Sequence, residues 1–304
     1  MTQRSSFLFD PWALDKWQAD FGNRLGLDRE LVLLEHVFPV EWLEALLGTL
    51  PPKHGLPYHL LMLGGRARLL HLAAELLRYV GAGEVAGYAK VPLGRLRERN
   101  LYPPTAGEFL VAPILRPVGA VKPQPQGRGH GADYMIDLSS GALVAEVKRL
   151  CTARRQERAA MDRVLADPER SGPIFTESEE RFNAQEDGRR LYPHVKHAAS
   201  QLGASARAVT VGERGPAIPG GVPGILFLDR DGNSLLANVH SRIVEWMRLS
   251  WAASIDLVVF FDFDSCGGTW RTVVELVFSR TGRAWNALVE ALRECSEGHL
   301  HVNE

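Results

Sequence analysis

The hydrophobic pattern divides the chain into a helical first third and a mixed remainder. Apolar residues recur at helical spacing along residues 1–100, with separate stripes at 12–21, 37–50 and 60–80. After residue 100, short strand-like runs alternate with helical segments, which is the pattern of an α/β fold. We therefore expect a helical N-terminal region at 1–100 and a second domain at 101–304, with a boundary at Pro103-Pro104.

The second domain is expected to combine a mixed sheet with several helices. Its predicted elements are a helix at 105–115, paired strands at 133–138 and 143–148, a helix at 191–206, a strand at 222–229, a helix at 239–252, strands at 255–262 and 272–278, and a closing helix at 284–295. Residues 152–190 alternate in charge and contain proline turns, so they read as a charged insertion between core elements.

The strands at 133–138 and 143–148 form the most informative segment. Apolar residues alternate with polar ones in each, and Ser140-Gly141 between them suits a two-residue turn because glycine accepts positive φ. This turn would set Asp133 opposite Lys148 in the hairpin.

Three side chains with complementary chemistry then share one face of the hairpin: Asp133, Glu146 and Lys148. Neighbouring carboxylates repel unless a proton or cation lies between them, and oxygen ligands of this kind suit Mg²⁺ or Mn²⁺. A lysine ammonium beside such an ion can orient an attacking water or stabilise charge on phosphorane oxygens. The pattern predicts a metal-dependent catalytic site for phosphodiester hydrolysis.

This pattern resembles the PD-(D/E)xK, or restriction-endonuclease-like, nuclease superfamily. The resemblance rests on Asp133 and on Glu146-Val147-Lys148, with Ala132 where the family often has proline, and it extends over residues 102–229. It implies a core of helix, three-stranded meander, helix and strand in a mixed sheet. It also implies metal-dependent hydrolysis of nucleic acid, with DNA as the expected substrate.

The resemblance implies further site residues on the flanking elements. Glu108, on the predicted helix at 105–115, is the candidate for an additional metal-binding carboxylate. Lys196 and Gln201, on the helix at 191–206, match only loosely the polar residues that many members place near phosphate or metal-bound water. Arg149 directly follows the Glu-x-Lys motif and is a candidate phosphate contact.

Two other interpretations of the hairpin remain open. Asp133, Glu146 and Lys148 can be cross-strand charge pairs on a solvated sheet face, each contributing a few tenths of a kcal/mol. The same fold can also serve as a non-enzymatic module that binds nucleic acid or a protein. Asp137, on the same face, is expected to be a solvated or supporting charge.

A more distant alternative comes from residues 224–231, where a buried strand leads into Asp229-Arg-Asp231-Gly. This resembles the nucleophile motif of haloacid-dehalogenase-type phosphatases. No lysine follows Asp231, and Asn233 replaces the usual threonine, so we interpret the segment as a turn leaving a strand. Asp256, Asp262 and Asp264 are likewise expected at turns and strand edges.

Composition sets limits on the remaining possibilities. The chain is 45% hydrophobic and 23% charged with a net charge of −1, so its overall charge gives no indication of nucleic-acid binding. Three scattered cysteines suggest neither disulfides nor a zinc site, and no segment resembles a leader or membrane span, which together favour a cytoplasmic protein. The N-terminal region shows no catalytic pattern and can mediate homodimerisation or binding of a protein partner.

Overall fold

The protein is described from a computed structural model. The described residues are 10–23, 25–47, 54–61, 63–81, 93–98, 101–123, 131–138, 141–149, 184–211, 222–229, 239–266 and 269–279. The closing helix expected at 284–295 lies outside them, as does most of the predicted insertion, at 151–183.

The N-terminal region is helical, as predicted. Its elements are α2 (Leu14–Phe21), α3 (Leu27–Val37), α4 (Val40–Leu47), α5 (Leu56–Leu61), α6 (Leu63–Gly81) and the 3-10 helix η1 (Leu93–Arg97). The Leu-rich segment expected at 60–80 belongs to the end of α5 and to most of α6. The two helices approach closely at Gly65, where a Cβ atom would lie 2.4 Å from the Cα of His59, so a larger residue would not fit.

The second part of the chain forms a six-stranded mixed sheet in the order β1-β2-β3-β4-β5-β6. The strands are β1 (Ala120–Pro123), β2 (Tyr134–Leu138), β3 (Gly141–Arg149), β4 (Gly224–Asp229), β5 (Leu257–Cys266) and β6 (Thr269–Ser279). β1, β2 and β3 form an antiparallel meander, β3, β4 and β5 are parallel, and β6 is antiparallel to β5. The predicted α/β fold is therefore confirmed.

In the described ranges, helical elements precede or connect these strands: α7 (Tyr102–Leu115) before β1, α9 (Ala184–Val211) between β3 and β4, and α10 (His240–Met247) with η3 (Ser250–Ala252) between β4 and β5. α9 begins earlier than the helix expected at 191–206, so the end of the predicted insertion belongs to it. Pro103 and Pro104 lie in the first turn of α7, where a missing N–H costs no helical hydrogen bond.

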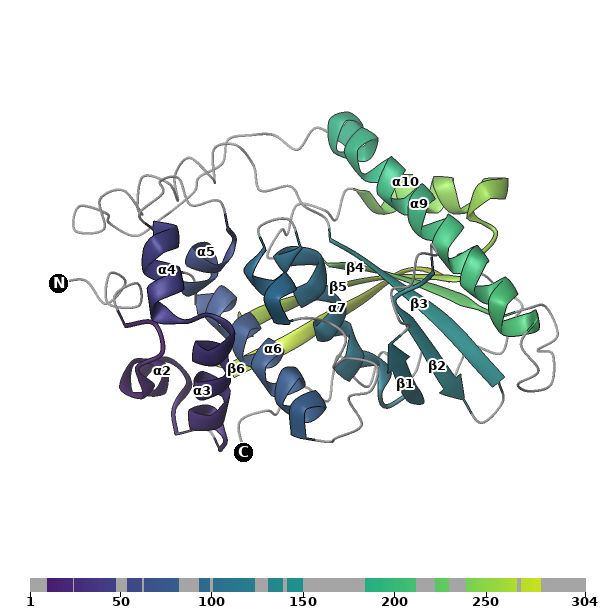
Figure 1. Ribbon diagram of the computed structural model, residues 1–304. Helices are drawn as coiled ribbons and strands as arrows, with labels where there is room; N and C mark the ends of the chain where they lie inside the picture. Colours follow the sequence, from purple (N-terminus) through teal and green to yellow (C-terminus); the bar gives the residue numbers. More distant parts are fainter. Residues whose placement is uncertain are drawn as a thin grey trace.

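Helices cover both faces of the sheet (Figure 1). On one face, α6 and α7 pack against side chains that include Tyr134, Val147 and Phe227, in an apolar cluster continuous with the N-terminal helices. On the other face, α9 and α10 pack against Val144, Leu226 and their neighbours. Alternation along each strand explains the arrangement, because successive side chains point to opposite faces.

The β2–β3 hairpin has a different register from the one expected. Leu138 pairs with Gly141 and Met135 pairs with Val144, so the pairing is displaced by two residues. Gly141 has φ +142°, a conformation that favours glycine, and it begins β3 instead of occupying the turn. A shift of two residues keeps every side chain on its predicted face, because the period of a strand is two.

Two further expectations about element ends were wrong. The helix expected at 239–252 divides after Met247 into α10 and η3. Asp262 and Asp264 lie within β5, which continues to Cys266, and not at its end. Asp256 lies directly before β5, at a strand end as expected; it is buried, and its carboxylate accepts the backbone N–H of Gly224 at 3.0 Å, so it joins the starts of β4 and β5. None of the helices in the described ranges is long and apolar enough to cross a membrane.

Candidate active site

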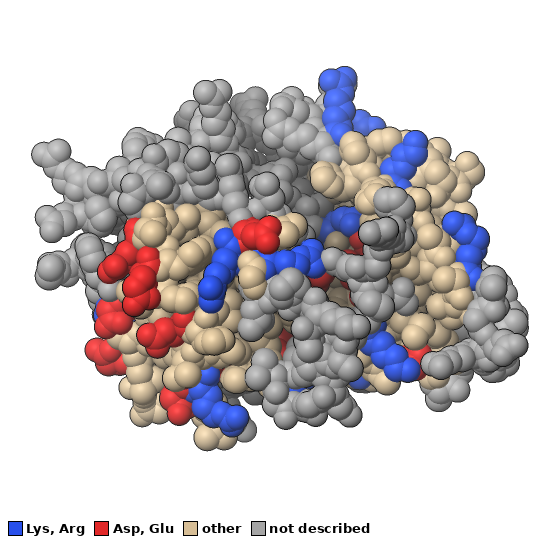
Figure 2. Space-filling view, in the orientation of Figure 1, with Lys and Arg blue, Asp and Glu red and all other residues tan. Residues whose placement is uncertain are grey.

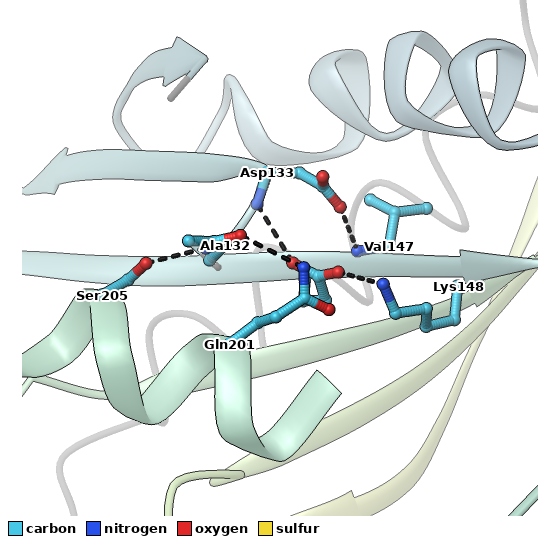
Figure 3. A network of polar contacts seen from close by, with 8 residues as sticks. Ala132, Asp133, Val147, Lys148, Gln201 and Ser205 are labelled. Carbon is cyan, nitrogen blue, oxygen red and sulfur yellow. Dashed lines mark hydrogen bonds and ion pairs between the residues drawn. The ribbon is translucent and has the colours of Figure 1, made fainter. Parts of the chain in front are cut away.

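The open end of the β2–β3 hairpin brings together an aspartate, a glutamate and a lysine (Figure 3). Asp133 lies just before β2, and its Oδ2 accepts the backbone N–H of Val147 at 2.8 Å. Its own N–H donates to Oε2 of Glu146 at 3.2 Å, while the ammonium of Lys148 forms an ion pair with Oε1 of Glu146. Asp133 is therefore adjacent to Glu146, and not opposite Lys148 as the predicted register required.

α9 fixes the segment that enters β2. The backbone N–H of Ala132 donates to Oγ of Ser205 at 2.7 Å, and Nε2 of Gln201 donates to the carbonyl oxygen of Gly131 at 3.2 Å. Gln201 and Ser205 are one helical turn apart and therefore share a side of α9. These two bonds fix the backbone just before β2, so that Asp133 lies beside β3 and its carboxylate accepts the N–H of Val147.

The carboxylates lie in a largely buried environment. The Glu146 side chain is fully buried, whereas 19% of the Lys148 side chain is exposed. The pKa of Glu146 is raised to about 8, chiefly by burial and then by the negative charge of Asp133, whereas Lys148 lowers it. Burial likewise raises the pKa of Asp133, against the Val147 N–H and the positive charges of Lys148 and Arg95.

This arrangement leaves an excess of negative charge when both carboxyl groups are ionised. Two carboxylates share one nearby ammonium, and the desolvated pair is stabilised either by a proton or by a cation. Among the described residues, no group of three or more His, Cys, Asp and Glu side chains is close enough together to hold a metal ion. The acidic donor set of this site is therefore the pair Asp133 and Glu146.

Glu108 is near this pair but does not complete a three-carboxylate cluster. It lies on α7, and its backbone carbonyl accepts the hydroxyl of Tyr134 at 2.6 Å, which joins α7 to β2. Its negative charge is close enough to raise the pKa of Glu146. Glu108 therefore contributes to the electrostatics of the site.

The predicted nucleic-acid contacts are placed differently from one another. Gln201 points from α9 toward the site (Figure 3), and no hydrogen-bond partner is found for its buried Oε1 in the part of the chain that the structure describes. Lys196 is exposed on another side of α9. The Arg149 side chain lies outside the described residues, although its backbone ends β3. Asp137 forms the expected surface ion pair, with Lys122 of β1.

Two arginines from the N-terminal region were missed by the sequence analysis. Arg95 of η1 is half-buried and close enough to Asp133 for its positive charge to lower the pKa of that carboxyl group. Arg68 of α6 is buried, and its guanidinium donates to both carboxylate oxygens of Asp229. Neither residue belongs to a sequence motif. Packing of the N-terminal helices on α7 and the sheet brings Arg95 near Asp133 and Arg68 against Asp229.

Asp229 ends a strand, as expected from the run at 222–229, but its buried partner was not predicted. It is the last residue of β4, is fully buried, and lies beside Gly107 of α7, where a Cβ atom would approach Oδ2 to 3.1 Å. Asp231 lies outside the described residues.

Comparison with protein-family models, with curated proteins and with solved structures finds no match to this chain.

Proposed function

We propose that the protein is a metal-dependent nuclease of the restriction-endonuclease-like class that hydrolyses phosphodiester bonds, with DNA as the expected substrate. The observation that carries the proposal is the cluster of Asp133, Glu146 and Lys148 at the end of the hairpin. Two buried carboxylates held against each other cost stability unless they serve a cation or a proton. A surface pair of opposite charges would not need this arrangement.

The order of elements also supports the proposal. α7, the β1-β2-β3 meander, α9 and β4 follow one another in the order that the resemblance implies, and β4 is parallel to β3. The cluster lies where the resemblance places an active site, at the start of one strand of the meander and near the end of the next. The N-terminal helices are an addition to this core.

The donor set fits Mg²⁺ or Mn²⁺. Magnesium is commonly held by one or two carboxylates, with water and substrate phosphate as further ligands, so the pair Asp133 and Glu146 is sufficient without Glu108. Such an ion, when bound, acts as a Lewis acid toward phosphate and lowers the pKa of water. Asp133 and Glu146 would hold it, and burial limits competing water.

Lys148 supplies the positive charge on the protein side. Its ammonium is partly exposed and is held in place by Glu146, so it can reach a phosphate at the mouth of the site. In that position it orients the attacking water by hydrogen bonding or stabilises negative charge on the phosphate oxygens as the new bond forms. Gln201 offers an amide oxygen on the same side, which can orient water.

The test is cleavage of supercoiled plasmid, linear duplex, single-stranded DNA and RNA with Mg²⁺ or Mn²⁺. We expect Asp133→Asn and Lys148→Met to lower the rate by about 100-fold or more, the usual effect of removing a group that stabilises transition-state charge. The matched control is Asp137→Asn, because Asp137 is an aspartate on the same face that pairs with Lys122. It should cleave like wild type.

A second measurement separates metal binding from catalysis. Mg²⁺ should raise the unfolding temperature of wild type and of Asp137→Asn, and the increase should be smaller in Asp133→Asn. Nucleic-acid binding without cleavage and without this increase would favour a non-enzymatic binding module on the same fold. Monoester hydrolysis abolished by Asp229→Asn would favour the phosphatase, which the pairing of both Asp229 oxygens with Arg68 argues against.

A further inference from the structure

An open groove runs between α9 and η3, on the outside of the helical layer. Its walls are formed by basic, hydroxyl and aromatic side chains together with small residues, among them Lys196, His197, Ser200, Arg207, Trp251 and Ser254. None of the described residues that line it is an aspartate or a glutamate. The groove is distinct from the candidate active site, because none of the three residues of that site contributes to its walls.

The groove and the active site lie on opposite flanks of α9. Lys196, Ser200, Gly203 and Arg207 follow one another at spacings of three and four, so they share one side of the helix. Gln201 lies about 100–140° away around the axis from Lys196 and Ser200, on the flank that contacts the segment entering β2. Only the exposed crest of α9 separates the two places.

Local packing gives the groove a defined shape. Ser254 donates its hydroxyl to the carbonyl oxygen of Ala199 at 2.5 Å, which ties η3 to α9. Trp251 packs edge-on against Tyr192, with ring centroids 5.5 Å apart. A Cβ atom on Gly203 would lie 3.6 Å from Nη1 of Arg207, so the guanidinium folds back along the helix over the glycine.

The charge of this side differs from that of the N-terminal helices. Residues 188–211 contain no aspartate or glutamate, whereas Arg189, Lys196 and Arg207 are exposed there. Exposed acidic residues gather instead over α2, α3 and α4, at the left of Figure 2, and basic side chains lie over α9 at the right. A chain with a net charge of −1 thus presents a locally basic surface beside its candidate active site.

We propose that the groove between α9 and η3 binds backbone phosphates of the nucleic acid that is cleaved at the Asp133–Lys148 site. The identity of this ligand rests on the proposed function. The lining residues offer ammonium, guanidinium and hydroxyl donors, which recognise phosphate oxygens without reading base sequence. The open shape suits a continuous chain that crosses α9 more than it suits an enclosed small molecule.

The two sites are compatible with one ligand. A helix is about 10 Å across, and phosphates advance about 3.4 Å per base pair along a strand, so the groove would hold phosphates about three base pairs or more from the scissile bond. The exposed His197, near the crest, lies between the two places and lines the groove. The groove would then fix which side of the scissile bond is held.

Binding of a labelled duplex and a labelled single strand, measured by fluorescence anisotropy in EDTA, tests the inference without any cleavage. We expect Lys196→Ala and Arg207→Ala each to weaken binding by about 3–10-fold and to reduce the slope of log K against log salt by about 0.9 per lost contact. Gly203→Glu places a negative charge in the groove at a helical position with room for a side chain, and should weaken binding by about 10-fold or more.

Arg29→Ala is the matched control, because Arg29 is an exposed arginine on α3 and its removal changes the net charge equally. It should leave affinity and salt slope unchanged. Equal weakening in Arg29→Ala and the groove variants, or no weakening in the folded groove variants, would overturn the inference. Since cleavage is measured separately, weakened binding with no metal-dependent cutting by wild type would overturn the nuclease proposal and leave the groove as a binding site.

Discussion

Two acidic centres at the ends of neighbouring strands differ in how their charge is balanced. Asp229, which ends β4, points to the face covered by α6 and α7, and Arg68 engages both of its oxygens. Asp133 and Glu146, at β3, share one lysine, and burial raises the pKa of both carboxyl groups. The charge of the first centre is balanced within the protein, whereas ionising both carboxyl groups of the second would give it an excess of negative charge.

On the proposed function, this difference distinguishes a structural centre at Asp229 from a metal-binding one at Asp133 and Glu146. A buried carboxylate with a bidentate guanidinium partner ties the N-terminal helices to the sheet, and both of its oxygens already accept from that partner. A pair of carboxylates with raised pKa values is costly to ionise, and that cost is recovered when a cation binds. The predictions below change each centre in turn.

The largest expected effect comes from removing Arg68, the arginine that balances the charge of Asp229. Arg68→Met leaves the carboxylate of Asp229 buried without its guanidinium partner, which should lower the free energy of unfolding by about 3–5 kcal/mol. The double variant Arg68→Met, Asp229→Leu should recover most of this loss, because no buried charge remains. Urea unfolding of the three proteins measures both effects.

Exposed Arg29 provides the control for the loss of an arginine, and Arg29→Met should change stability by less than about 0.5 kcal/mol. Folded Arg68→Met should still cleave nucleic acid at low temperature. A small destabilisation, or loss of cleavage in a folded variant, would place Arg68 and Asp229 in the functional centre and remove the contrast.

A smaller effect of characteristic pH dependence is expected at the carboxylate pair. The pKa of Glu146 is about 8 in the folded protein against 4.5 for an ordinary glutamate, so the folded state holds a proton that the unfolded state releases. Its contribution to stability is present below pH 4.5 and is lost as the pH rises toward 8. Glu146→Gln should therefore gain about 1–3 kcal/mol relative to wild type between pH 5 and pH 8.

Urea unfolding at several pH values, in EDTA, measures this gain. Asp137→Asn is the appropriate comparison because the Asp137 carboxylate is a surface ion pair, and its stability difference from wild type should change little over the same range. A Glu146→Gln difference that is constant with pH would mean that the pair is ionised in the folded protein without a cation. The two acidic centres would then be alike in their charge balance.

The sequence predicted the elements around the candidate site better than their pairing. Alternation of period two identified both strands of the hairpin and the face shared by Asp133, Glu146 and Lys148. It could not set the register, because a shift of two residues leaves every side chain on the same face. The observed register places Asp133 beside Glu146, which is the contact on which the proposed metal site depends.

Contacts between the N-terminal helices and the sheet could not be predicted in the same way. Arg68 lies 161 positions from Asp229 along the chain. No local sequence pattern indicates that an arginine on a leucine-rich helix has a buried carboxylate partner. The turn-forming residues after Asp229 indicated that a strand ends there, but they gave no indication of its arginine partner. Long-range pairing of this kind depends on tertiary packing, so local periodicity carries no information about it.

The smallest expected effect tests whether the N-terminal region also influences the centre formed by Asp133 and Glu146. The positive charge of Arg95 lowers the pKa of Asp133, so Arg95→Ala should raise that pKa and move the acid limb of the cleavage profile to higher pH. Because the interaction acts over some distance and is partly screened, cleavage near neutral pH should fall by only about 2–5-fold.

Arg97→Ala is the control on the same 3-10 helix, since the Arg97 guanidinium donates to the carbonyl oxygens of Val37 and His36 and supports α3. It should lower stability without moving the pH profile. Identical pH profiles for wild type and Arg95→Ala would mean that the charges acting on the site come from the hairpin, Glu108 and α9. The N-terminal helices would then act only through the pair of Arg68 and Asp229.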